Sequence, residues 1–202
     1  MNWKEKYPII LLVIYLIIWI ILAVSPKYRS VWIDENILTV LFVVLLVVSY
    51  KWFKFSNFSY GLLFVFMILH AIGGHYSYND NPLFDFLQNM FEMRRNHYDR
   101  IVHFLFGIMF FLPIYEVVTR MFKVPKGWRG FFIAFFVVVA LKGGFEVIEY
   151  AYVWVKSDPL TVSNYLGEQG DSWDAHKDVG LGIIGAMISW MIIGVNRILR
   201  KV

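Results

Sequence analysis

Long apolar segments separated by short polar stretches dominate the chain, and this pattern predicts helices that span a membrane. Each segment is close to the roughly 18–20 residues that a helix needs to cross a bilayer. They lie at residues 8–24, 36–53, 58–72, 99–121, 130–153 and 175–196. Gly73-Gly74 follows the third segment, and we expect these glycines to break that helix. The pattern predicts an all-α fold, a single integral membrane domain over residues 1–202 built as a bundle of about six helices.

The composition indicates that lipid is the main solvent of this chain. The 202 residues are 59% hydrophobic and 19% aromatic, whereas a soluble domain is about 45–50% apolar. The first segment is longer than the apolar core of a signal peptide and no small-residue cleavage motif follows it, so we interpret it as an uncleaved span. The absence of cysteine excludes disulfides, thiolate metal ligands and cysteine nucleophiles.

Basic residues in the short loops predict the orientation, because they collect on the cytoplasmic side. One side carries a basic set that only Glu5 opposes, namely Lys4, Lys6, Lys51, Lys54, Arg120, Lys123, Lys126, Arg129, Arg197, Arg200 and Lys201. The other side offsets Lys27 and Arg29 with Asp34 and Glu35, which we place in a loop. We therefore expect both termini to be cytoplasmic and the loops at 73–98 and 157–174 to lie outside. The net charge of +4 lies in these clusters, and nucleic acid is not an expected partner.

Ionisable side chains stand at or near the outer ends of the apolar segments. Counting along each helix from its cytoplasmic end places His70, His103, Glu146 and Asp178 at about 24–28 Å, just inside a hydrocarbon core of about 30 Å. The whole set consists of His70, His75, Asp99, His103, Glu146, Glu149, Asp171, Asp174 and Asp178. Charged groups are costly at this depth, so a shared level predicts a functional site.

Asp99 and His103 are four residues apart and share a helix face that Gly107 continues. The pair can bind a metal ion together, or the carboxylate can orient the imidazole as a general base. The structural alternative is a buried hydrogen bond that joins two helices. Gly107 would let another backbone approach this face closely.

Glu146 and Glu149 lie three residues apart, and Lys142 lies one turn before Glu146. Paired glutamates inside a helix bundle can bind metal or carry protons. The structural alternative is an ion pair between Lys142 and Glu146 that neutralises both charges in the membrane. We expect that pair, which leaves Glu149 free for a site.

The stretch that ends at Asp178 opens the last segment. We expect Asp171 to cap the N-terminus of this helix. Asp174 and Asp178 lie one turn apart on a face that Gly182 and Ala186 continue, and small residues permit close helix packing in lipid. The acids should therefore point inward. Oxygen ligands gathered in this way favour Mg²⁺, Mn²⁺ or Ca²⁺, and an added histidine admits Zn²⁺ or Fe²⁺.

Several motifs follow one another over residues 60–190. They are His70-x-x-Gly73-Gly74-x-Tyr76-x-Tyr78, Arg95-Asn96-His97-Tyr98-Asp99-Arg100-x-x-His103-Phe104-x-x-Gly107, Glu116, Glu146-x-x-Glu149 and Gly170-Asp171-x-Trp173-Asp174-x-x-x-Asp178 with Gly185-Ala186. This series resembles the YjdF-like family of bacterial inner-membrane proteins, which implies a multi-pass protein of the bacterial cytoplasmic membrane and no particular reaction. His176 departs from the pattern, because a neutral polar residue such as glutamine is expected at this position. Whether His176 joins the site is left open. A fainter resemblance to VanZ-like proteins implies a role in the cell envelope.

The leading hypothesis is a metal-dependent membrane hydrolase at the outer leaflet that acts on a lipid or lipid-linked phosphate. Its metal ligands or acid/base groups would be Asp99, His103, Glu149, Asp174 and Asp178, with His70, His75, Glu146 and Asp171 as further metal candidates. Arg95 and Arg100, with Tyr76 and Tyr78, would bind the substrate, although the arginines can also simply neutralise the acids. The alternatives are a transporter or ion- or lipid-binding protein that uses the same residues, and a purely structural role. The sequence does not indicate the metal or the oligomeric state.

Overall fold

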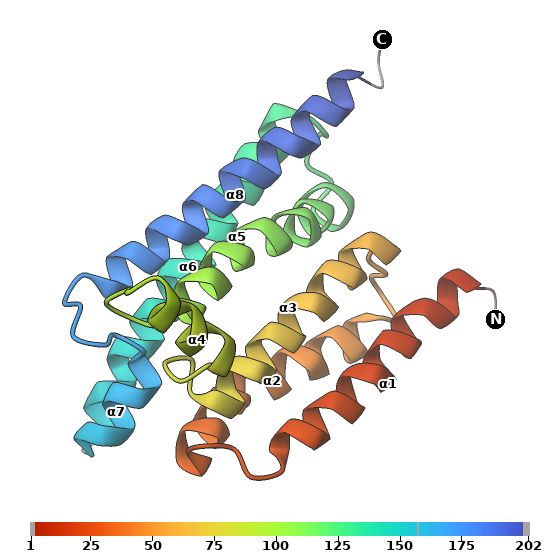
Figure 1. Ribbon diagram of the computed structural model, residues 1–202. Helices are drawn as coiled ribbons and strands as arrows, with labels where there is room; N and C mark the ends of the chain where they lie inside the picture. The colour runs from red at the N-terminus through yellow and green to blue at the C-terminus, as the bar shows by residue number, and fades with distance from the viewer. Residues whose placement is uncertain (1–2, 157, 200–202) are drawn as a thin grey trace.

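The computed structural model describes residues 3–156 and 158–199, and every regular element within them is helical (Figure 1). The long helices are α1 (Trp3–Ala23), α2 (Arg29–Ser49), α3 (Asn57–Tyr76), α5 (Tyr98–Glu116), α6 (Trp128–Val155) and α8 (Asp174–Leu199). A π-helical turn, η1 (Val117–Met121), extends α5, and two short helices, α4 (Pro82–Met90) and α7 (Pro159–Leu166), lie in the two longest connections. The all-α prediction is confirmed.

Six of these helices are long and apolar enough to cross a membrane. They match the predicted spans in order, and most of their outward-facing side chains are apolar. The protein is therefore a multi-pass membrane bundle. Figure 1 shows the start of α1 and the end of α8 at the same end of the bundle. This agrees with termini on one side of the membrane, while the assignment of that side to the cytoplasm stays a prediction. Arg200 and Lys201, which that assignment used, lie outside the described residues.

The predicted extents of two helices were wrong. The second span begins at Arg29 instead of residue 36 and ends at Ser49 instead of 53, so Asp34 and Glu35 lie inside α2 and not in a loop. The third helix continues through Gly73-Gly74 to Tyr76.

Packing explains why the two glycines do not end α3. A Cβ at Gly73 would lie 2.5 Å from Cε1 of Tyr78, so the missing side chain makes room for the ring as the chain turns back. The helix ends at Ser77, whose φ of 65° is left-handed. Gly73 therefore serves a close contact, and neither glycine breaks the helix.

Helix α5 is the centre of the bundle, because it packs against α8, α3 and α6. Its closest neighbour is α8. A Cβ at Gly107 would overlap the carbonyl oxygen of Gly182, and one at Gly185 would overlap the carbonyl oxygen of Phe104. The close approach expected at Gly107 is thus confirmed, and the partner is the last helix.

Candidate metal centre

The N-terminal end of α5 is fixed by the segment before it. Asn96 is fully buried and its side-chain oxygen accepts from the backbone N–H of Tyr98 at 3.0 Å, which satisfies one unpaired donor of the first turn. Its amide nitrogen donates to Asp85 of α4 at 2.7 Å. Tyr98 donates its hydroxyl to the backbone oxygen of Leu69 in α3 at 2.7 Å. These contacts set the position and rotation of the turn that carries Asp99 and His103.

Asp99, His103 and Asp178 converge between α5 and α8. Each offers one donor atom, and the three atoms lie within 4.8 Å of one another. The residues are 5%, 8% and 3% exposed, respectively. His103 Nε2 lies 2.9 Å from Asp99 Oδ1. Asp99 Oδ2 and Asp178 Oδ1 are buried and have no hydrogen-bond partner in the described part of the chain.

Helix α6 adds a further layer of charge. Lys142 is 2% exposed and pairs with Glu146, as the spacing predicted. Glu146 Oε1 lies 3.8 Å from His103 Nδ1, so α6 contacts the cluster through this carboxylate. Glu149 interacts electrostatically with Lys142, Asp99 and Asp178. Both glutamates therefore belong to the surroundings of the centre.

Arg95 closes the cluster from the loop side. Its Nη1 pairs with Asp174, and its Nη2 donates to the Gly167 carbonyl at 2.9 Å and lies 4.0 Å from Asp99 Oδ2. Arg95 is 6% exposed. Asp174 is buried, as predicted, but its first partner is this arginine. Arg95 therefore links the loop between α7 and α8 to the side chains of the centre.

A second ion-pair group lies further out. Asp171 pairs with Arg100 and Lys177, and Arg100 Nη2 also lies 3.3 Å from Asp174. A hydrogen bond from Lys177 is the main reason that the pKa of Asp171 falls to about 2, with smaller contributions from the Trp173 backbone and Arg100. The predicted helix cap at Asp171 was wrong, because α8 begins three residues later and Asp171 accepts instead from the backbone N–H of Trp173 at 3.1 Å.

The histidines on α3 lie outside this group of three. His70 Nδ1 hydrogen-bonds the hydroxyl of Tyr78, and its ring interacts electrostatically with that of His103. His75 Nδ1 lies 2.7 Å from the backbone oxygen of Leu22, so it joins α3 to α1.

The tyrosines near α3 and His176 also take separate positions. Tyr76 packs edge-on against His75, and His176 packs edge-on against Trp173. Tyr78 is 7% exposed, and burial raises its pKa, so the phenol stays protonated. Of the tyrosines in the substrate prediction, Tyr78 interacts electrostatically with Asp99.

Sequence reasoning missed Glu35. This residue is 6% exposed in α2 and interacts electrostatically with Asp99 and Glu149. Its neighbours Asn36 and Thr39 are also buried. Three polar positions on one face of an apolar helix were the available signal, and the nearby Lys27 and Arg29 obscured it by suggesting a charged loop.

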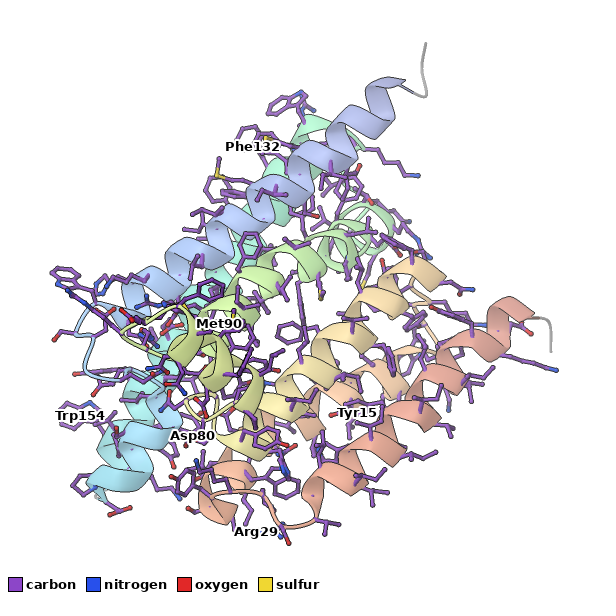
Figure 2. The ribbon with its side chains drawn as sticks, viewed as in Figure 1. Tyr15, Arg29, Asp80, Met90, Phe132 and Trp154 are labelled. Atoms are coloured by element: carbon purple, nitrogen blue, oxygen red, sulfur yellow. The ribbon has the colours of Figure 1, made fainter. Side chains whose placement is uncertain are left out.

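Carboxylates outnumber cations around the centre. Figure 2 shows nitrogen- and oxygen-bearing side chains gathered between the labelled Trp154, Met90 and Asp80, at the end of the bundle where α4 and α7 lie. The acids are Glu35, Asp99, Glu146, Glu149, Asp174 and Asp178, and the basic side chains are Arg95, Arg100 and Lys142. A buried excess of negative charge needs a compensating cation or bound protons.

Comparison with known proteins agrees with the fold and the motifs. The model of the family described as "Predicted membrane protein (DUF2238)" matches residues 7–198. The chain belongs to this family. It is also 27% identical over 171 residues to the inner membrane protein YjdF of Escherichia coli (strain K12), which covers 85% of this chain and 81% of that protein. No solved structure matches the chain.

Membership of this family confirms the predicted resemblance and the inner-membrane location. The motif residues that suggested it, Asp99, His103 and Asp178, are the same ones that converge. The family description says nothing about a reaction or a metal, and these remain to be argued from the geometry.

Proposed function

We propose that this protein binds a divalent cation through Asp99, His103 and Asp178. The supporting observation is the pair of buried carboxylate oxygens, one from Asp99 and one from Asp178, that have no hydrogen-bond partner in the described structure. An unpaired buried acceptor of this kind costs about 1–3 kcal/mol, and more for a charged group. A cation between these oxygens and the imidazole would remove that cost and would offset the excess of carboxylates.

The ligand types limit the choice of cation. Two carboxylates and one imidazole suit Zn²⁺, Mn²⁺ or Fe²⁺ better than Ca²⁺, which prefers oxygen ligands alone. Three protein ligands also leave coordination positions for water, as in catalytic rather than structural sites. The neighbouring Glu146 would orient His103 through Nδ1, as a carboxylate does for a metal-bound histidine.

Hydrolysis of a lipid or lipid-linked phosphate is the activity we propose for this centre. A cation held by Asp99, His103 and Asp178 would activate water as the nucleophile that displaces the leaving oxygen from phosphorus. Glu149 is a nearby carboxylate that would take the proton from the water and return it to the leaving oxygen. The apolar residues between the centre and the other side of the membrane favour a site that is reached from one side only.

Cation transport is the competing function, and it needs a polar path to the other side of the membrane. Below the centre, α5, α6 and α8 instead form a buried apolar cluster, which contains Phe111, Tyr115, Val118, Phe131, Ala134, Val138 and Ala186. This cluster argues against a polar path through these helices and favours a site reached from one side only.

The test is the metal content of the purified protein, measured after loading with Zn²⁺ or Mn²⁺ and removal of free metal. We expect about one bound ion, and at least about 10–100-fold weaker binding in Asp99→Asn and Asp178→Asn, because even the loss of a residue that only orients a metal ligand costs this much. Glu116→Gln is the matched control, because Glu116 is also a buried carboxylate, 8% exposed, but pairs with Arg120 at the opposite end of α5. Equal binding by Asp178→Asn would contradict the centre.

Activity is tested separately in nanodiscs that contain a lipid phosphate. Metal-dependent phosphate release by the natural protein, absent in Asp178→Asn, supports hydrolysis. Metal binding without phosphate release, but with metal uptake into sealed vesicles, supports the transporter instead.

A further inference from the structure

A groove runs along the outer surface between the first turns of α5 and α8. It has a volume of about 510 Å³ and is lined by His97, Arg100, Ile101, Phe104, Lys177, Gly180, Leu181 and Ile184. Along the chain, the charged and polar residues of this lining come first in each of the two segments, and the large apolar ones follow within two helical turns. The groove is therefore cationic at its outer end and apolar toward the middle of the membrane.

The apolar part faces lipid. Ile101 is 41% exposed and Ile184 is 50% exposed, and both belong to helices that are apolar enough to span a membrane. From Lys177 to Ile184 the helix rises about 10 Å. This length of wall matches the first several methylenes of an acyl chain and not a soluble ligand.

The basic side chains at the outer end of the groove have hydrogen-bond donors that can bind an anion. Arg100 and Lys177 share one carboxylate, Asp171, and Arg100 has a second contact with Asp174, whose main partner is Arg95. Arg100 Nε is buried and has no hydrogen-bond partner among the described residues. The N-termini of α5 and α8 add partial positive charge at the same place.

We propose that this groove binds an anionic phospholipid. The phosphate contacts Arg100 and Lys177, and one acyl chain lies along Ile101, Phe104, Leu181 and Ile184. Arginine and lysine are the usual partners of phosphate, and a lipid supplies phosphate and apolar chain in the arrangement that the groove offers.

The lipid site does not depend on the cation centre. Asp99 and Asp178 lie on the inward faces of α5 and α8, whereas the groove residues lie on the faces that point to lipid. Loss of one site therefore leaves the other measurable.

The experiment counts lipids that stay bound to the protein by native mass spectrometry, after exchange into detergent with phosphatidylglycerol or phosphatidylcholine. Gly180→Phe fills the groove, because a Cβ at Gly180 meets no atom within 4 Å. Gly194→Phe is the matched control, since Gly194 lies on the same helix, away from the groove, and is equally open. We expect retention of phosphatidylglycerol over phosphatidylcholine, lost in Gly180→Phe and kept in Gly194→Phe.

A second variant tests the charge without filling the groove. Lys177→Gln removes a side chain that is 49% exposed, so the fold should tolerate the change. We expect about ten-fold weaker binding of phosphatidylglycerol, the loss that follows removal of one charge-assisted hydrogen bond. Equal retention of both lipids by the natural protein, or unchanged binding in both Gly180→Phe and Lys177→Gln, overturns the proposal. Competition by glycerol phosphate as strong as that by the lipid would show that the groove recognises the phosphate alone, and would also overturn it.

Discussion

Lys142 shows how one side chain in the membrane can be both predictable and consequential. It is 2% exposed, pairs with Glu146 and interacts with Glu149 and Asp178. The four-residue spacing to Glu146 was sufficient to predict that pair from the sequence. The interaction with Asp178 was not predictable in the same way, because Asp178 belongs to another helix.

Replacing Lys142 by methionine should destabilise the protein. Glu146 would then be a buried carboxylate without its cation, and breaking a buried pair from one side costs about 3–5 kcal/mol. The measurement is thermal unfolding in detergent. In the double variant Lys142→Met/Glu146→Gln the cost should be smaller than in Lys142→Met, because the uncompensated charge is gone. If the double variant is less stable than Lys142→Met, the loss of stability does not come from the unpaired Glu146 carboxylate.

At the scale of elements, the contact between α5 and α8 decides whether a site exists. Asp99 and His103 come from one helix and Asp178 from the other, so their convergence requires the two backbones to lie close together. The absence of a side chain at Gly107 of α5 and at Gly185 of α8 permits this approach. The sequence indicated small residues on both helices, but it did not show that these two faces meet each other.

Gly107→Ala should separate the two helices. The added methyl group would overlap the Gly182 carbonyl, and overpacking of this kind costs about 1–3 kcal/mol. We expect a lower melting temperature and weaker metal binding. Gly144→Ala is the matched control, because a Cβ there meets nothing within 4 Å and alanine favours the helix by about 0.5–1 kcal/mol. Equal melting temperatures for Gly107→Ala and the natural protein would disprove the close contact.

At the scale of the whole molecule, the protein is a six-span bundle in which the start of α1 and the end of α8 lie at the same end (Figure 1). The candidate centre and the proposed lipid groove lie toward the other end of the bundle, where α4 and α7 lie in the two long connections. If the basic loops are cytoplasmic, both sites face the outside of the cell membrane. Access from outside is therefore a consequence of orientation, which can be tested directly.

Single cysteines can report this orientation cleanly, because the natural chain contains none. In intact cells a membrane-impermeant maleimide should label Ser172→Cys, in the connection before α8. It should label Lys126→Cys, in the connection before α6, only after the cells are permeabilised. The reverse pattern would place the centre and the groove on the cytoplasmic side.

The sequence by itself determined the number of spans, their order and the common depth of the polar residues. These properties follow from hydropathy and helix rise, which are local. It could not determine which acids meet, because that depends on how each helix is rotated and which neighbour it contacts. Only the tertiary structure grouped Asp99 and His103 with Asp178, left Asp171 to an outer ion pair, and added Glu35 from a stretch that looked like a loop.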